Sequence, residues 1–127
     1  ADGAVFVAGL TSALDFPVTP GALDNALVFT SSGYRFDGFV SKFSGNLSTL
    51  LASTYLGGSQ FDQVFSIALG PGGNVYVAGY TESPDFPTTP GAYDNTFNGV
   101  GSHGSPFVAK LNGTLTRIPS STFLGHC

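Results

Sequence analysis

Residues 73–95 read GNVYVAGYTESPDFPTTPGAYDN, and residues 3–25 read GAVFVAGLTSALDFPVTPGALDN. The two stretches begin 70 residues apart (73 − 3), and 15 of their 23 aligned positions are identical. Two more matched pairs follow in the same order, each at a spacing of 68: FVSKF at 39–43 with FVAKL at 107–111, and STYLG at 53–57 with STFLG at 121–125. Similarity at a fixed period is typical of repeat proteins, in which each copy forms one structural unit.

Each copy is predicted to form short strands. Residues 4–11 and 74–81 carry apolar side chains on both faces of an extended chain, so these strands need cover from two sides. Further strands are predicted at 39–43, 50–56, 61–69, 107–111 and 121–125, and the polar content of 50–56 is interpreted as that of an outer strand. In 61–69, simple alternation places Phe65, Ile67 and Leu69 on one face. The long connections after 11 and 81 contain DFP and TPGA, whose prolines exclude a helix.

The strand order predicts an all-β fold made of four-stranded antiparallel blades, of the kind that build a β-propeller. A two-sheet sandwich is the alternative, but it would show polar alternation, which 5–10 and 75–80 lack. Residues 1–57 are predicted to supply strands two to four of one blade, and residues 58–127 all four strands of the next. Because propellers close with roughly four to eight blades, we expect either a partial propeller from a longer repeat array or several copies that close a ring.

Composition excludes several classes of partner and site. Four Lys and Arg residues and a net charge of −4 leave no basic patch for nucleic acid. No apolar run reaches the roughly 20 residues that a membrane-spanning helix needs. The single cysteine, Cys127, cannot form an internal disulfide, and with His126 it offers only two metal ligands, too few for a site unless another chain completes it.

Four motifs in fixed order, VYVAGYT, DFPTTPGA, FVAKL and STYLGG, resemble the bacterial β-propeller repeats called SBBP. The resemblance covers nearly two copies. It implies a repeat from large bacterial proteins that are secreted or attached to the cell surface, with an extracellular or periplasmic location. It implies no catalytic residue and no cofactor.

The candidate site residues lie in the long connections. The repeated aspartate of DFP is interpreted mainly as a turn residue, with calcium ligation by loop carboxylates as the alternative; the candidate ligands are Asp15, Asp24, Asp85 and Asp94. Tyr93 and Phe97 are the aromatic side chains expected to be exposed, and with His103 they are the candidates for binding a carbohydrate or a protein.

The sequence therefore favours a non-enzymatic structural or binding module, whose partners are further blades or other subunits of an extracellular assembly. Two alternatives remain. One is a propeller enzyme whose active site is built from several blades, because fold alone does not determine function. The other is a short chain that oligomerises into a closed propeller.

Overall fold

The computed structural model describes residues 3–12, 16–24, 36–58, 60–97 and 104–124. These residues form two antiparallel sheets, with strand orders β1-β2-β3 and β4-β5-β6-β7, and one 3₁₀ turn, η1 (Pro71–Gly73). The strands are β1 (Val5–Thr11), β2 (Asp37–Phe43), β3 (Leu50–Leu56), β4 (Asp62–Leu69), β5 (Val75–Thr81), β6 (Ser105–Leu111) and β7 (Ser120–Phe123). Neighbours in each sheet are consecutive along the chain, so both sheets are meanders and the predicted all-β fold is confirmed.

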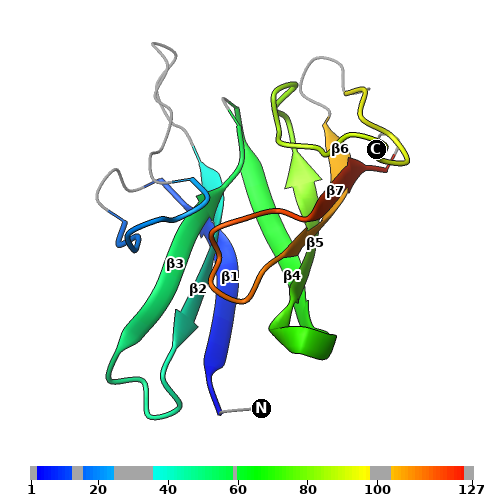
Figure 1. Ribbon diagram of the computed structural model, residues 1–127. Coiled ribbons are helices and arrows are strands. Elements are labelled where there is room, and N and C mark those ends of the chain that lie inside the picture. The colour runs from blue at the N-terminus through cyan, green and yellow to red at the C-terminus, as the bar shows by residue number, and fades with distance from the viewer. Residues whose placement is uncertain (1–2, 13–15, 25–35, 59, 98–103, 125–127) are drawn as a thin grey trace.

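The two sheets lie side by side, with β4 as the strand of the second sheet that contacts β1 and β2 of the first (Figure 1). The connections after β1 and β5 leave the same end of the sheets, at the top of Figure 1. The connection between β6 and β7 reaches across from the second sheet toward the first. Among the described residues, no helix is long and apolar enough to cross a membrane.

The core fills the space between the two sheets. Its fully buried members include residues from both, with relative exposures of 4% or less: Val40, Leu56, Val64, Val75, Val77, Phe107, Leu111 and Phe123. The repeat equivalents of Val75 and Val77 are Val5 and Val7, which are 37% and 42% exposed. The same face is therefore covered in the second sheet and open in the first, which agrees with strands that are apolar on both sides.

Close approach of strands explains one glycine of the repeated VAG motif. A β-carbon on Gly79 would lie 2.0 Å from the carbonyl oxygen of Gln63 in β4. The distance is too short for any side chain, so this position requires glycine.

Two expectations about individual strands need correction. β3 is an outer strand, as predicted, but its polar residues Ser53 and Thr54 are fully buried. Polar content was therefore the wrong reason to predict an outer strand.

In β4, the pairing with β5 shifts between Val64 and Ser66. The shift leaves Phe65 as an extra residue that is 67% exposed, while Val64 and Ile67 both pack on the core. The prediction that Phe65 lies on the same face as Ile67 is therefore wrong, because the bulge interrupts the alternation.

Candidate functional site

The long connection of the second repeat is bound to the outer strand of its own sheet. Thr89 and Ser121 are joined by three hydrogen bonds. The Thr89 amide and hydroxyl donate to the Ser121 carbonyl at 3.1 Å and 3.2 Å, and the Ser121 amide donates to the Thr89 hydroxyl at 3.1 Å. Further along, the Asp94 amide donates to Thr122 Oγ1 at 2.8 Å, and the Phe123 amide donates to the Asp94 carbonyl at 2.9 Å. We call this set of bonds the clamp.

The first repeat has the same clamp. The Thr19 amide donates to the Ser53 carbonyl at 3.1 Å, and the Asp24 amide donates to Thr54 Oγ1 at 2.9 Å. The Tyr55 amide then donates to the Asp24 carbonyl at 3.0 Å. Asp24 and Asp94 thus hold the connection through their main chains.

Removing one clamp hydroxyl tests how much the clamp contributes. Thr54→Val is expected to lower the free energy of unfolding by about 1–2 kcal/mol, because the half-buried Asp24 amide loses its acceptor. Chemical denaturation followed by circular dichroism measures the change. Thr54→Ser keeps the hydroxyl and is the control; if both variants lose the same amount, the loss comes from packing and not from the clamp.

The phenylalanine of each DFP motif anchors the connection. The Phe16 ring lies 4.6 Å from that of Phe39 and 5.8 Å from that of Tyr55. In the second repeat the Phe86 ring lies 4.2 Å from that of Phe107 and is 3% exposed. Burial of an aromatic ring therefore holds this part of each connection against its sheet.

Two buried carboxyl groups, which the sequence analysis did not single out, lie where the first sheet passes into the second. Asp62 at the start of β4 is fully buried. Its Oδ1 accepts hydrogen bonds from the Thr81 and Ser83 hydroxyls, and its Oδ2 accepts one from the Gly58 amide at 2.9 Å. A β-carbon on Gly57 would lie 2.4 Å from Oδ2, so glycine leaves the space that this carboxylate occupies.

Asp37 at the start of β2 is also fully buried, but its surroundings differ. With both carboxyl groups ionised, neither oxygen of Asp37 has a hydrogen-bond donor among the described residues, but a proton on Asp37 lets it bond to Asp62. Burial, followed by the negative charge of Asp62, raises the pKa of Asp37 to about 9. Burial also raises the pKa of Asp62, to about 6, against the lowering effect of its hydrogen bonds, that from Thr81 first. At neutral pH the pair therefore holds one proton, on Asp37, and one negative charge, on Asp62.

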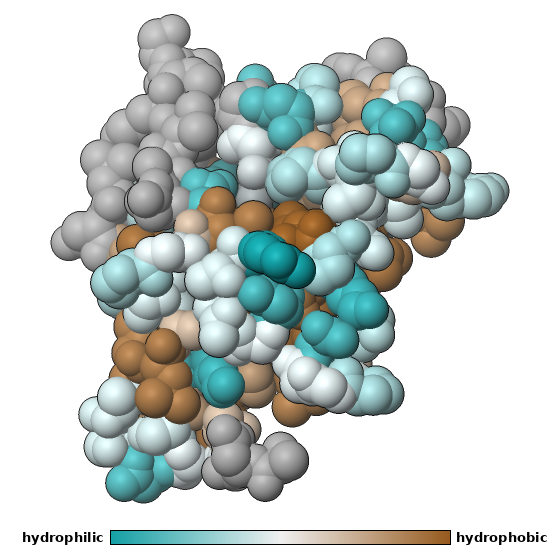
Figure 2. All heavy atoms as spheres, viewed as in Figure 1, coloured by the Kyte–Doolittle hydropathy of each residue, from teal (hydrophilic) through white to brown (hydrophobic). Residues whose placement is uncertain are grey.

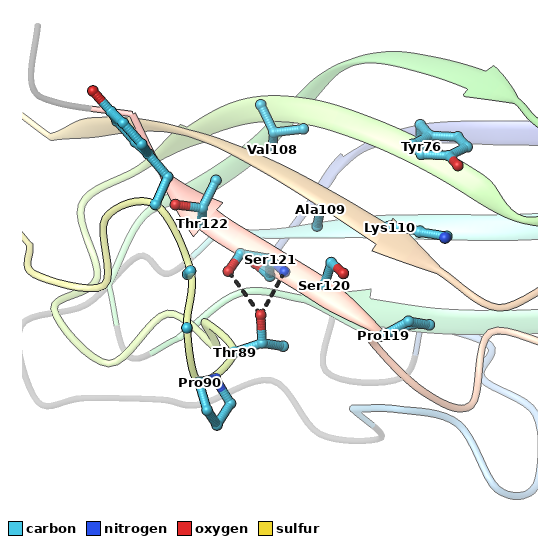
Figure 3. Close-up of a pocket in the computed structure, with 13 residues that line it drawn as sticks. Tyr76, Thr89, Pro90, Val108, Ala109, Lys110, Pro119, Ser120, Ser121 and Thr122 are labelled. Carbon is cyan, nitrogen blue, oxygen red and sulfur yellow. Dashed lines mark hydrogen bonds between the residues drawn. The ribbon is translucent and has the colours of Figure 1, made fainter.

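A groove of about 450 Å³ opens on the second sheet (Figure 3). One wall is the connection at 89–93, and the floor and far wall are strand residues, namely Tyr76, Val108, Lys110 and the segment 120–122. The clamp bonds between Thr89 and Ser121 form the base of the first wall, as the dashed lines in Figure 3 show. We call this cavity the open groove.

Comparison with family models finds one matched segment. Residues 53–87 match the family described as SBBP, β-propeller repeat. The match covers 35 of the 127 residues, and this segment is similar to an SBBP repeat. Comparison with curated proteins gives no match.

The SBBP segment runs across the boundary between the two sheets. It begins in β3 of the first sheet and ends after β5 of the second, at the DFP motif. It includes Asp62 and its three donors at Gly58, Thr81 and Ser83. The matched segment therefore contains the junction between the two sheets together with the hydrogen bonds of Asp62.

The described candidate residues of the two long connections do not meet in one place. Among the described residues, no three His, Cys, Asp or Glu side chains are grouped as a metal site requires. Asp94 Oδ1 accepts the Thr96 amide at 3.0 Å in an Asx-type turn. Asp85 packs against Gly58, where an added β-carbon would lie 2.3 Å from its Oδ1. Calcium binding stays a prediction.

The aromatic candidates differ from each other. Tyr93 is 85% exposed, as expected, and lines the open groove. Phe97 was expected to be exposed, but it is half-buried because its ring packs at 5.7 Å on that of Phe123. Asp15, His103, His126 and Cys127 lie outside the described residues.

Proposed function

We propose that the chain is a non-enzymatic structural module of a secreted or cell-surface bacterial protein, whose partners are further blades or other subunits. The observation that supports the proposal is that these polar groups form hydrogen bonds to other parts of the fold. The hydrogen bonds of Asp62 and both clamps are directed inward and hold the connections and the junction in place. Groups that are already bonded within the fold are poorly suited to acid–base chemistry on a substrate.

If the protein were an enzyme, the buried pair Asp37 and Asp62 would be the candidate for its acid and base. Two neighbouring carboxyl groups with displaced pKa values are common in active sites. Asp37 and Asp62 are both 0% exposed, however, so no substrate reaches them in this arrangement. Their position between the sheets supports a structural role.

Turnover measurements test the non-enzymatic part of the proposal. The purified protein is incubated with chromogenic glycosides, esters and peptides, and product is followed over time. We expect binding at most and no turnover. Hydrolysis at a rate of about 1 s⁻¹ or more would overturn the proposal, and Asp62→Ala would then show whether the carboxyl pair is responsible.

Location is tested separately. SBBP repeats suggest export, so we expect protease added to intact bacterial cells to remove the protein without lysis. A cytoplasmic control protein must survive the same treatment. Protection of the SBBP protein until the cells are opened would contradict a surface location and leave the turnover result unaffected.

A further inference from the structure

The groove of the first sheet that corresponds to the open groove is already filled by the chain itself. Its occupant is the turn between β6 and β7, residues 112–117, which we call the Leu115 turn. Leu115 is fully buried in the core, and its carbonyl accepts the Leu23 amide at 3.0 Å. Thr116 lies against the first connection, where a β-carbon on Gly21 would be 3.6 Å from its Cγ2.

The first sheet carries an equivalent turn at residues 44–49, which we call the Leu47 turn. In both turns the leucine amide donates to the carbonyl three residues earlier, at 2.8 Å for Leu47 and 3.0 Å for Leu115. Both leucines have positive φ, 63° and 58° respectively. Leu115 is fully buried, whereas Leu47 is 61% exposed.

An exposed leucine with positive φ needs an explanation. The left-handed conformation costs a residue with a β-carbon about 1 kcal/mol or more, and glycine or asparagine would avoid most of this cost. Leu115 offsets it by burial. Leu47 has the same strain without the burial, as expected of a side chain that is covered by a partner.

The open groove is the matching surface without an occupant. Val108 on its floor is 41% exposed, whereas the equivalent Val40 is fully buried beneath the second sheet. Tyr93, the equivalent of Leu23, is 85% exposed. An added β-carbon at Gly91 would meet no atom within 4 Å, in contrast to Gly21. The second sheet thus repeats the receiving surface of the first, and nothing among the described residues fills it.

We propose that the open groove binds the Leu47 turn of a second copy of this chain, in the way that the first sheet binds the Leu115 turn. The proposal rests on the module role proposed above and names its partner. Among the described residues, the Leu47 turn of the first sheet and the open groove of the second sheet are both uncovered. Such a contact joins chains head to tail, and it gives a ring if the rotation closes and a longer assembly if it does not.

The contact is tested with two variants that block opposite sides. Leu47→Asp places a charge on the turn but leaves the groove intact. Val108→Arg places a charge on the floor of the groove but leaves the turn intact. Both positions are exposed in the single chain, so both variants are expected to fold, and circular dichroism checks this. Leu47→Met keeps an apolar side chain of similar volume and is the matched control.

Analytical ultracentrifugation over a roughly hundredfold concentration range reports the assembly. We expect the wild type and Leu47→Met to rise above the monomer mass, and each blocked variant to stay monomeric. An equimolar mixture of Leu47→Asp and Val108→Arg retains one intact turn and one intact groove, so it is expected to form a dimer and stop there.

Three results would overturn the proposal. The first is a wild type that stays monomeric throughout the range, in which case the occupant is a different segment or molecule. The second is assembly that persists in both blocked variants. The third is a mixture that stays monomeric while the wild type assembles. None of these depends on turnover or location, so failure of this contact is distinguishable from failure of the proposed function.

Discussion

Leu115→Asn is expected to lower the free energy of unfolding by about 2–4 kcal/mol, and Leu47→Asn is expected to raise it slightly. Replacing a fully buried leucine removes apolar contacts and leaves a cavity, and the relief of positive φ offsets only about 1 kcal/mol of that loss. At Leu47 the same relief of backbone strain is offset by little loss of buried contacts, because this side chain is exposed in the single chain. One substitution in two equivalent turns therefore has effects of opposite sign.

Denaturant unfolding at a concentration where the chain is monomeric measures both variants. Leu115→Met and Leu47→Met keep the apolar volume and the strained conformation, so each is expected within about 1.5 kcal/mol of the wild type. Equal losses in the two asparagine variants would show that Leu47 is already packed in the monomer. That outcome would remove the strain argument for the head-to-tail contact.

Alanine substitutions at the two buried aspartates are also expected to differ in their effect on the free energy of unfolding. At pH 5, Asp62→Ala should lower the free energy of unfolding by about 3 kcal/mol, because the Thr81 and Ser83 hydroxyls and the Gly58 amide lose their acceptor. Asp37→Ala removes the same atoms from an equally buried position but loses only the hydrogen bond between the protonated Asp37 and Asp62. It is therefore expected to stay within about 1 kcal/mol of the wild type. Equal losses in the two variants would contradict this account of the junction.

The pH dependence follows from the raised pKa of Asp37. The folded chain keeps a proton on this carboxyl up to a pH of about 9, whereas the unfolded chain releases it near the ordinary aspartate pKa of 3.8. Because the folded state binds more protons, its stability is greatest below the unfolded pKa and falls as the pH rises toward 9. Asp62, with a pKa raised to about 6, adds to the fall in the lower part of this range.

Asp37→Asn tests that dependence. It should flatten the stability profile between about pH 6 and 9 and make the variant more stable than the wild type at pH 8, by a few kcal/mol. Thermal unfolding at several pH values gives the profile, with Asp94→Asn as the control carboxyl. A wild type whose stability rises with pH over this range would show that Asp37 is ionised in the folded state.

Most of the strand arrangement could be predicted from the repeat. The two-sided apolar pattern of 4–11 and 74–81 required neighbours on both faces, and matched spacings placed the remaining strands. The bulge in β4 could not be predicted, because the residue type of Phe65 does not show whether it is paired or is the extra residue of a bulge. The burial of Ser53 and Thr54 was missed because their hydroxyls find partners that only the fold supplies: Ser41 on the neighbouring strand for Ser53, and main-chain groups of Asp24 for Thr54.

The junction and the contact surfaces were harder to predict. Asp37 and Asp62 lie 25 residues apart (62 − 37) in unlike contexts, and only folding brings their carboxyl groups together. A comparison of the copies would have helped: Asp37 stands where the second copy has Ser105, another fully buried residue whose side-chain oxygen has no partner among the described residues. Likewise, Leu47 and Leu115 align at a spacing of 68, but their difference in exposure exists only in three dimensions.

The matched segment at 53–87 begins in one sheet and ends in the other, so it carries the joint between two sheets and no complete sheet. A duplication of one full repeat period, 68–70 residues, that begins at residue 53 copies this joint whole and cuts through the sheets on either side. The new copy arrives with the aspartate, glycine and hydroxyl residues that attach it to its neighbour. Growth or shrinkage of such an array by recombination therefore preserves the joints, and each unfinished sheet is completed by strands that the adjoining copy brings.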